Sequence, residues 1–183
     1  MHRRPWTAVV AAALVPLSFG VTACSDDGNK PRMVEPHEVY VTVIRWELER
    51  IGRAAADDQP DASAPVGSDD ADEPGLPVMY VAAADGSAIS AGVQAKVAAA
   101  TVDDAMVRFA DSPDDVVDSD ADGRPVNDDG VLLSIERIDP DESDRRTTEV
   151  VIYRSESDQD TWTLTVVASQ DGATITSSTL QPS

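Results

Sequence analysis

Residues 161–166 alternate between threonine and apolar side chains, and this alternation constrains the fold more than any other feature of the chain. Successive side chains of a strand point to opposite faces of a sheet. One face would therefore carry the apolar set, which is Trp162, Leu164, Val166 and Ala168. Thr163 and Thr165 would lie on the other face. The pattern predicts an antiparallel sheet with one buried face and one polar face, and the polar face is a candidate docking surface.

Neighbouring segments extend this sheet. They predict a four-stranded antiparallel meander with strands at Val131–Ile138, Thr148–Ser155, Thr161–Ser169 and Ala173–Leu180. The dipeptide Asp171-Gly172 is the type preferred in two-residue type I′ hairpins.

The middle of the chain predicts alternating strands and helices. Val78–Ala84 and Ala105–Ala110 have the apolar content of short strands. Between them an Ala-rich helix would bury a narrow stripe made of Ile89, Val93 and Val97. Ser112 followed by Pro113 is typical of a helix N-terminus, so a short helix to about Val117 is expected.

Residues 35–53 fit two structures. The helical spacing is carried by Tyr40, Ile44, Leu48 and Ile51, whereas a strand would align Tyr40, Ile44, Trp46 and Leu48. A helix is favoured because the run exceeds the usual strand length. It would begin at Pro36 and end at Gly52. We therefore predict an α+β fold, with a C-terminal antiparallel β-meander packed against two or three helices.

On that helix, Glu47 and Glu49 would point in different directions. Together with Arg50 they are expected to lie on a solvated face.

The amino terminus has the organisation of an export signal. Met1–Arg4 is positively charged, and Trp6–Phe19 is an apolar run too short to span a bilayer core as a helix. Small residues then precede a cysteine in the sequence Val21-Thr22-Ala23-Cys24, whose Cys24 is the only cysteine of the chain.

Val21, Thr22, Ala23 and Cys24 resemble the lipobox of bacterial lipoproteins. The resemblance implies cleavage before Cys24 and attachment of lipid, such as palmitate, to its sulfur. Multiple acyl chains give stable anchoring, so the protein would sit on the extracytoplasmic face of the cell membrane. The frequent Ala, Asp and Arg add a similarity to envelope lipoproteins of actinobacteria.

Two alternatives remain for the leader. Ordinary secretory cleavage beside an incidental cysteine would leave the protein without lipid. Arg3-Arg4 invites export by the twin-arginine route, although the residues that follow favour general secretion.

The chain divides into three parts on this basis. Residues 1–23 are the predicted signal peptide, residues 24–34 a lipidated flexible tether, and residues 35–183 a single α+β domain. Within the domain, residues 54–76 are rich in Ala, Asp, Pro, Gly and Ser and lack apolar periodicity, so a disordered insert is expected there.

The charge balance argues against a nucleic-acid partner. The 183-residue chain has 34 acidic and 14 basic residues, a net charge of −20. Removal of the predicted leader, which holds Arg3 and Arg4 and no acid, makes the mature charge about −22. Nucleic-acid binding requires a basic footprint that such a chain lacks, so no nucleic-acid partner is expected.

One acidic segment resembles the calcium loop of EF-hands and of their non-helical bacterial relatives. The resemblance implies side-chain ligands from Asp118, Asp120, Asp122 and Asp129, with the carbonyl of Arg124. The alternative is a plain solvated loop, since Asp is frequent throughout this chain. No other cofactor is expected.

No catalytic residue is assigned from the sequence. A Ser–His–Asp site would have to use His37, which is more simply a surface histidine in a first helical turn. Trp46, Trp162 and Tyr153 are too scattered for a sugar platform and are expected in or near the core.

The sequence thus favours a binding or interaction module of the cell envelope, whose partner is another envelope protein or a small ligand. An extracytoplasmic enzyme of the hydrolase kind and a calcium-stabilised module are the alternatives.

Overall fold

The computed structural model describes residues 32–57, 75–138, 144–170 and 172–182, all within one structural unit, Pro31–Ser183. Its centre is a six-stranded mixed sheet with the order β2-β1-β3-β4-β5-β6. The strands are β1 (Val78–Ala83), β2 (Met106–Phe109), β3 (Val131–Ile135), β4 (Arg145–Ser155), β5 (Asp158–Ser169) and β6 (Gly172–Leu180). The predicted α+β class, with its antiparallel meander from β3 to β6, is confirmed.

The sheet is parallel at its other end. β1 pairs in parallel with β2 on one side and with β3 on the other. The sequence predicted these strands but not their pairing. Parallel neighbours need long connections, and here α2 (Ala91–Thr101) links β1 to β2.

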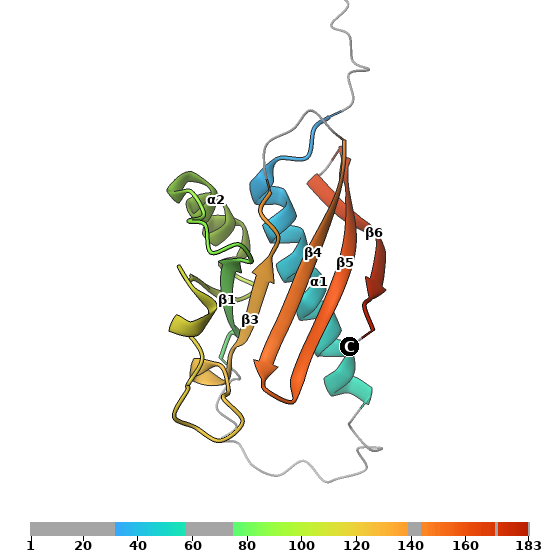
Figure 1. Ribbon diagram of the computed structural model, residues 1–183. Coiled ribbons are helices and arrows are strands. Elements are labelled where there is room, and N and C mark those ends of the chain that lie inside the picture. Colours follow the sequence, from blue (N-terminus) through green and yellow to red (C-terminus); the bar gives the residue numbers. More distant parts are fainter. Residues whose placement is uncertain (1–31, 58–74, 139–143, 171, 183) are drawn as a thin grey trace, which may run out of the picture. The chain divides into compact units, whose positions relative to one another are not determined.

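Two helices cover one face of the sheet. α1 (Pro36–Asp57) crosses behind β4 and β5, and α2 lies beside it (Figure 1). Their apolar side chains form the main core with the inward residues of the sheet, among them Ile44, Leu133 and Leu164, which are fully buried. The alternation of residues 162–168 is confirmed, since its apolar members all pack in this core.

The opposite face is covered only in part. The connection from β2 to β3 carries two single-turn 3₁₀ helices, η1 (Pro113–Asp115) and η2 (Asn127–Asp129). Val116 and Val126 of this connection pack on Tyr80 and Leu132 in a second, smaller core. Gly130 closes the connection at a point where a Cβ atom would lie 3.1 Å from the Tyr80 ring.

Helix α1 is longer at its end than the sequence predicted. It begins at Pro36 as expected, but it passes through Gly52 and ends at Asp57. The predicted stop at Gly52 is therefore wrong, because helix propensity in the following Ala-rich turn outweighs one glycine. The first four residues of the expected insert, 54–57, are helical, and residues 58–74 lie outside the described part of the chain.

The domain also begins earlier than expected. Val34, placed at the end of the tether by the sequence, is 1% exposed and belongs to the main core.

The remaining differences from the predicted elements are small. β3 ends at Ile135, and the helix after Ser112 is the single turn η1. Gly172 pairs with Ser169 as the first residue of β6 rather than as a central turn residue.

Candidate functional site

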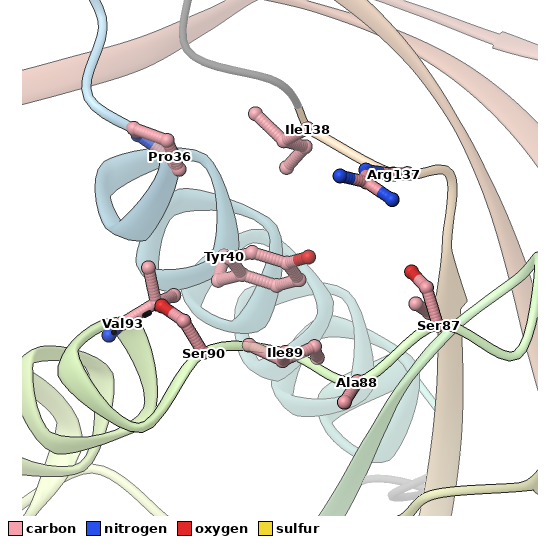
Figure 2. Close-up of a pocket in the computed structure, with 10 residues that line it drawn as sticks. Pro36, Tyr40, Ser87, Ala88, Ile89, Ser90, Val93, Arg137 and Ile138 are labelled. Carbon is pink, nitrogen blue, oxygen red and sulfur yellow. Dashed lines mark hydrogen bonds between the residues drawn. The ribbon is translucent and has the colours of Figure 1, made fainter.

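A cavity of about 250 Å³ opens where α1 and α2 begin and where β1 ends (Figure 2). Ser87, Ala88, Ile89 and Ser90 border it from the segment between β1 and α2. The other walls come from the two helices and from the ends of β1 and β3, and comprise Pro36, Tyr40, Ala83, Val93, Arg137 and Ile138. Ligands of open sheets commonly bind beyond the carboxyl ends of parallel strands, which is where this cavity lies.

Tyr40 projects from the second turn of α1 into the cavity (Figure 2). Its side chain is only 4% exposed, and its hydroxyl has no hydrogen-bond partner among the described residues. Burial raises the pKa of this phenol above its usual value, with a further rise from Asp85 opposed by Arg137. The hydroxyl is thus a protonated donor at neutral pH, and it is not among the buried polar atoms of the described residues that lack a partner, so water can reach it.

The first turn of α2 forms another wall of the cavity. Ser90 is the N-cap, and its hydroxyl oxygen accepts a 3.4 Å hydrogen bond from the Val93 N–H. The first turn contains no acidic residue. The positive end of the helix dipole is therefore not neutralised by a side chain of its own turn.

Arg137 and Asp85 are two charged residues, within the described part of the chain, that act on the Tyr40 hydroxyl. Arg137 lines the wall, and in Figure 2 its guanidinium lies on the same side of the cavity as the Tyr40 hydroxyl. Asp85 accepts hydrogen bonds from Ser87, including a 2.9 Å bond from its N–H, and these hold the pKa of the Asp85 carboxyl below its usual value. None of the described residues that line the cavity is acidic.

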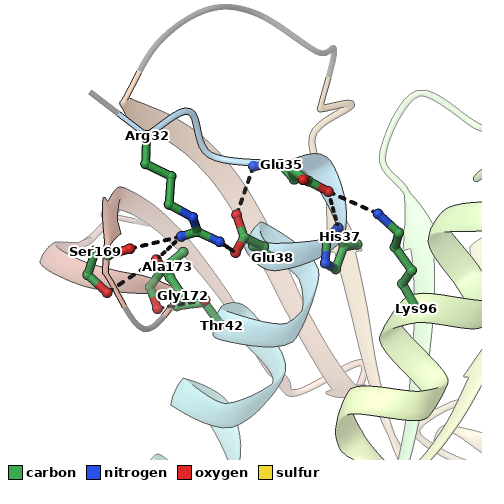
Figure 3. Close-up of polar contacts among 9 residues, drawn as sticks. All are labelled: Arg32, Glu35, His37, Glu38, Thr42, Lys96, Ser169, Gly172 and Ala173. Carbon is green, nitrogen blue, oxygen red and sulfur yellow. Dashed lines mark hydrogen bonds and ion pairs between the residues drawn. The ribbon is translucent and has the colours of Figure 1, made fainter. Parts of the chain in front are cut away.

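The first described residues are tied to the same end of the domain (Figure 3). Arg32 donates to the carbonyls of Ser169 and Gly172 and pairs with Glu38. The Glu38 carboxylate in turn accepts a 2.9 Å bond from the N–H of Glu35. These contacts join the described residues before α1 to the end of β5 and the start of β6.

His37 lies in the first turn of α1, as expected. Its Nδ1 is 3.2 Å from the carboxylate of Glu35, which also accepts a 3.0 Å bond from Lys96 of α2. This bond from Lys96 is the main reason that the pKa of Glu35 is below its usual value. His37 does not line the cavity between α1 and α2.

The acidic loop predicted to bind calcium is closed by its own hydrogen bonds. The Asp118 carboxylate accepts from the N–H groups of Asp120 and Ala121, and the Arg124 carbonyl accepts from the Tyr153 hydroxyl at 2.7 Å. Gly123 has a φ of 76°, the left-handed turn that favours glycine.

Within the described residues, no three His, Cys, Asp or Glu side chains are grouped to hold a metal ion, and this includes Asp118, Asp122 and Asp129. The calcium site stays a prediction. A melting temperature raised by millimolar Ca²⁺, but not by NaCl of equal ionic strength, is its test.

The expectation of a solvated face for Glu47 is wrong. Glu47 is fully buried, where its carboxylate pairs with Arg50 on α1 and with Arg154 on β4. Its hydrogen bond is the main reason that the pKa of Arg50 is raised. The sequence held a signal for this position, because Glu47 lies three residues after Ile44 and four before Ile51 on the apolar stripe.

Trp46 and Trp162 are half-buried beside this ion cluster, as expected of residues near the core. Their rings meet edge to face with centroids 5.2 Å apart, and Arg50 lies over the Trp162 ring. Tyr153 lies on the other face, in the smaller core. The two tryptophans therefore form one contact across α1 and β5, which their distance in the sequence concealed.

The predicted lipidation residue Cys24 and the lipobox residues Val21, Thr22 and Ala23 lie outside the described residues. No helix in the described part of the chain is both long and apolar enough to cross a membrane.

Comparisons with protein-family models, with curated proteins and with solved structures find no match to this chain.

Proposed function

We propose that this protein is a lipid-anchored binding module of the cell envelope, and that it holds a small ligand in the cavity between α1 and α2. The single observation that supports binding is the Tyr40 hydroxyl, a donor that faces the cavity and makes no hydrogen bond to another described residue. A bound molecule that accepts this hydrogen bond would replace the water that otherwise solvates the hydroxyl.

The dimensions favour a small molecule over a protein segment. The cavity of about 250 Å³ lies just below the 300–1,000 Å³ common for sites of drug-sized ligands. Its walls mix apolar side chains with a few polar groups, which is the usual composition of small-molecule sites.

The anchor is supported by the leader sequence. Arg32 follows Cys24 by eight positions, a chain length that reaches at most about 29 Å. Because Arg32 is bound to the end of the domain where α1 begins, a lipid on Cys24 would keep the cavity close to the bilayer. The protein would then bind its ligand near the membrane surface.

Fractionation tests the anchor. The parent chain should sediment with the membranes, and mass spectrometry should find acyl groups on an amino-terminal Cys24. The variant Cys24→Ala should lose both. A parent protein with an intact, unacylated leader contradicts the anchor.

A fragment screen by NMR tests the binding function. The full-length chain should bind small molecules whose signals map to the residues around Tyr40. Ala88→Trp, at an exposed position on the wall, should block them, whereas Ala98→Trp on the exposed side of α2 should not. If no fragment of any charge maps to the cavity, the binding function is wrong.

A further inference from the structure

The two edge strands of the sheet differ in how well they are protected from pairing with another strand. β2 has only four residues and carries Arg108. β6, the outermost strand next to β5 (Figure 1), has nine residues. Residues 172–182 contain no charged side chain, in a chain with 34 acidic residues. Edge strands are usually kept short, charged or interrupted by proline, because a long uncharged edge is a template for another strand.

The first half of β6 is covered by helix α1. The carbonyl of Ala173 accepts a 3.2 Å hydrogen bond from the Thr42 hydroxyl of α1, and Ile175 packs against the main core. The register with β5 then shifts between Ile175 and Ser177, which leaves Thr176 as the extra residue of a bulge. A bulge disrupts the regular ladder of a strand. The open part of the edge therefore begins after Thr176.

Residues 177–181 form a regular stretch whose outer backbone groups are unpaired. The N–H of Gln181 donates to the Thr161 carbonyl at 2.8 Å, so Gln181 turns its backbone groups toward β5. This direction alternates along an antiparallel strand, so Ser178 and Leu180 turn their backbone groups away from β5. No described residue makes a hydrogen bond to these outward groups. They are therefore available to a further strand.

The open stretch is symmetric about Thr179. The bulge at Thr176 bounds it on one side, and Pro182, which has no N–H to donate, bounds it on the other. Thr179 lies three positions from each of these limits. A two-fold axis beside Thr179 would place Ser178 of one copy opposite Leu180 of another. Because both residues turn outward, each such pair would exchange two backbone hydrogen bonds.

From this symmetry we infer that β6 pairs antiparallel with β6 of a second copy of this chain, about a two-fold axis at Thr179. The pairing joins two six-stranded sheets at their open edges. Leu180, which is 50% exposed, lies diagonally across from Leu180 of the second copy and is shielded from water there.

The charge distribution favours a second copy over a different protein. Like charges directly opposite each other destabilise paired strands, and residues 177–181 contain none. Two copies of a strongly acidic chain can therefore meet at this edge, whereas a basic partner strand would find no charge on it to pair with. The inference goes beyond the proposed ligand cavity and does not depend on it, since no residue of β6 lines that cavity.

Cysteine cross-linking tests the register. In the full-length Cys24→Ala chain, an introduced cysteine is the only thiol. Thr179→Cys would place two thiols in a non-hydrogen-bonded pair, whose Cα atoms are about 4.5 Å apart and within reach of a disulfide. Mild oxidation should give a covalent dimer. In the control Ser177→Cys the two cysteines are offset by about 13 Å along the strands, so dimer should form about tenfold less.

Sedimentation equilibrium tests the association without a covalent bond. An interface this short is weak, so the mean mass of the Cys24→Ala chain should rise toward that of a dimer between about 10 μM and about 1 mM. Ser178→Pro removes only an outward N–H, which an edge strand tolerates, and should keep the chain monomeric. Leu180→Lys should do the same by placing like charges near each other across the axis. Circular dichroism and melting should show both variants folded like the parent.

Four outcomes overturn the inference. They are a parent chain that stays monomeric at about 1 mM, equal cross-linking of Thr179→Cys and Ser177→Cys, and folded Ser178→Pro or Leu180→Lys chains that dimerise like the parent. The fourth is a disulfide formed in cells between Thr179→Cys and a different protein but not a second copy, which would assign the edge to that protein. Fragment binding in the ligand cavity is expected to be the same in all of these variants, so the failure of either proposal leaves the other standing.

Discussion

The two halves of the sheet differ in how many of their faces are covered by other parts of the domain. β1 and β3, in the parallel half, are buried on both faces, by the helices on one side and by the β2–β3 connection on the other. β5, in the antiparallel half, is covered on one face only, and its residues 161–166 alternate between outward threonines and inward apolar side chains. β4 differs from β5 because Tyr153 on its other face packs in the smaller core. The composition of each strand follows from this, because a strand covered on both sides needs a continuous apolar run.

The comparison also locates the polar chemistry. In the antiparallel half, the helix that covers the sheet brings a carboxylate, Glu47, into the interior with two arginines. In the parallel half, the strands end at the cavity lined by Tyr40 and Arg137. The buried ion cluster of Glu47 and the candidate site are therefore separated between the two halves.

The largest effect is expected where charge is buried in the antiparallel half. Glu47→Ala would leave Arg50 and Arg154 without their buried partner, and should cost about 3–5 kcal/mol of unfolding free energy. Glu49→Ala, on the exposed side of the same helix, should change it by less than about 0.5 kcal/mol. Urea denaturation measures the unfolding free energy of both variants. Equal losses would show that the Glu47 carboxylate does not stabilise the fold through Arg50 and Arg154.

A pair of neighbouring residues tests burial on both faces of the parallel half. Leu133 points into the main core and Leu132 into the smaller one. Leu133→Ala and Leu132→Ala should each cost about 2–5 kcal/mol, since both leave a cavity in a packed core. A cost below about 1 kcal/mol for Leu132→Ala in urea denaturation would mean that the connection does not pack on this face.

The same experiment on β5 should give unequal results. Leu164→Ala should cost about 2–5 kcal/mol, because Leu164 is fully buried beneath α1. Thr165→Ala, on the uncovered face, should cost less than about 1 kcal/mol. Thermal and urea unfolding of the two variants measure the contrast, and a large cost for Thr165→Ala would contradict the open face.

A smaller effect is expected in the connection that covers the parallel half. Ser112 caps η1, accepting from the Asp114 N–H while its own N–H donates to the Asp115 carboxylate. Ser112→Ala removes the side-chain acceptor and should cost about 0.5–1 kcal/mol. Hydrogen exchange should become faster at η1 and stay unchanged at β5, and a uniform increase would contradict a local role.

The pH dependence of the same connection follows from Asp128. Its carboxylate accepts from the Tyr80 hydroxyl at 2.8 Å and pairs with Arg108, and the hydrogen bond from Tyr80 is the first cause that lowers its pKa. A lowered folded-state pKa gives a stabilisation that is complete above the unfolded-state pKa and is lost as the pH falls through the folded-state value.

NMR titration should therefore find the Asp128 midpoint below that of an ordinary aspartate. In Tyr80→Phe the midpoint should rise toward the ordinary value. An unchanged midpoint in this variant would show that the Tyr80 hydroxyl does not hold the carboxylate.

Local patterns were sufficient to predict most of the elements. Periodicity predicted the helix from Pro36, the strands, and the residues of segment 162–168 that face the core. It could do so because helical and strand periodicities arise from burial of a single face. The boundaries of the elements were predicted less accurately, as at Gly52, because the stability of a terminal helical turn depends on its surroundings.

The sequence alone determined the alternation that makes β4 to β6 an antiparallel sheet with one covered face, and the helical stripe that lets α1 cover it. The tertiary structure decided the parallel pairing of β1, the burial of Glu47 beside Arg154, and the meeting of Tyr40 with Arg137 at one cavity. Periodicity reports only which face of an element is buried. The neighbour that buries it comes from a distant part of the chain, and that choice depends on the packing of the whole domain.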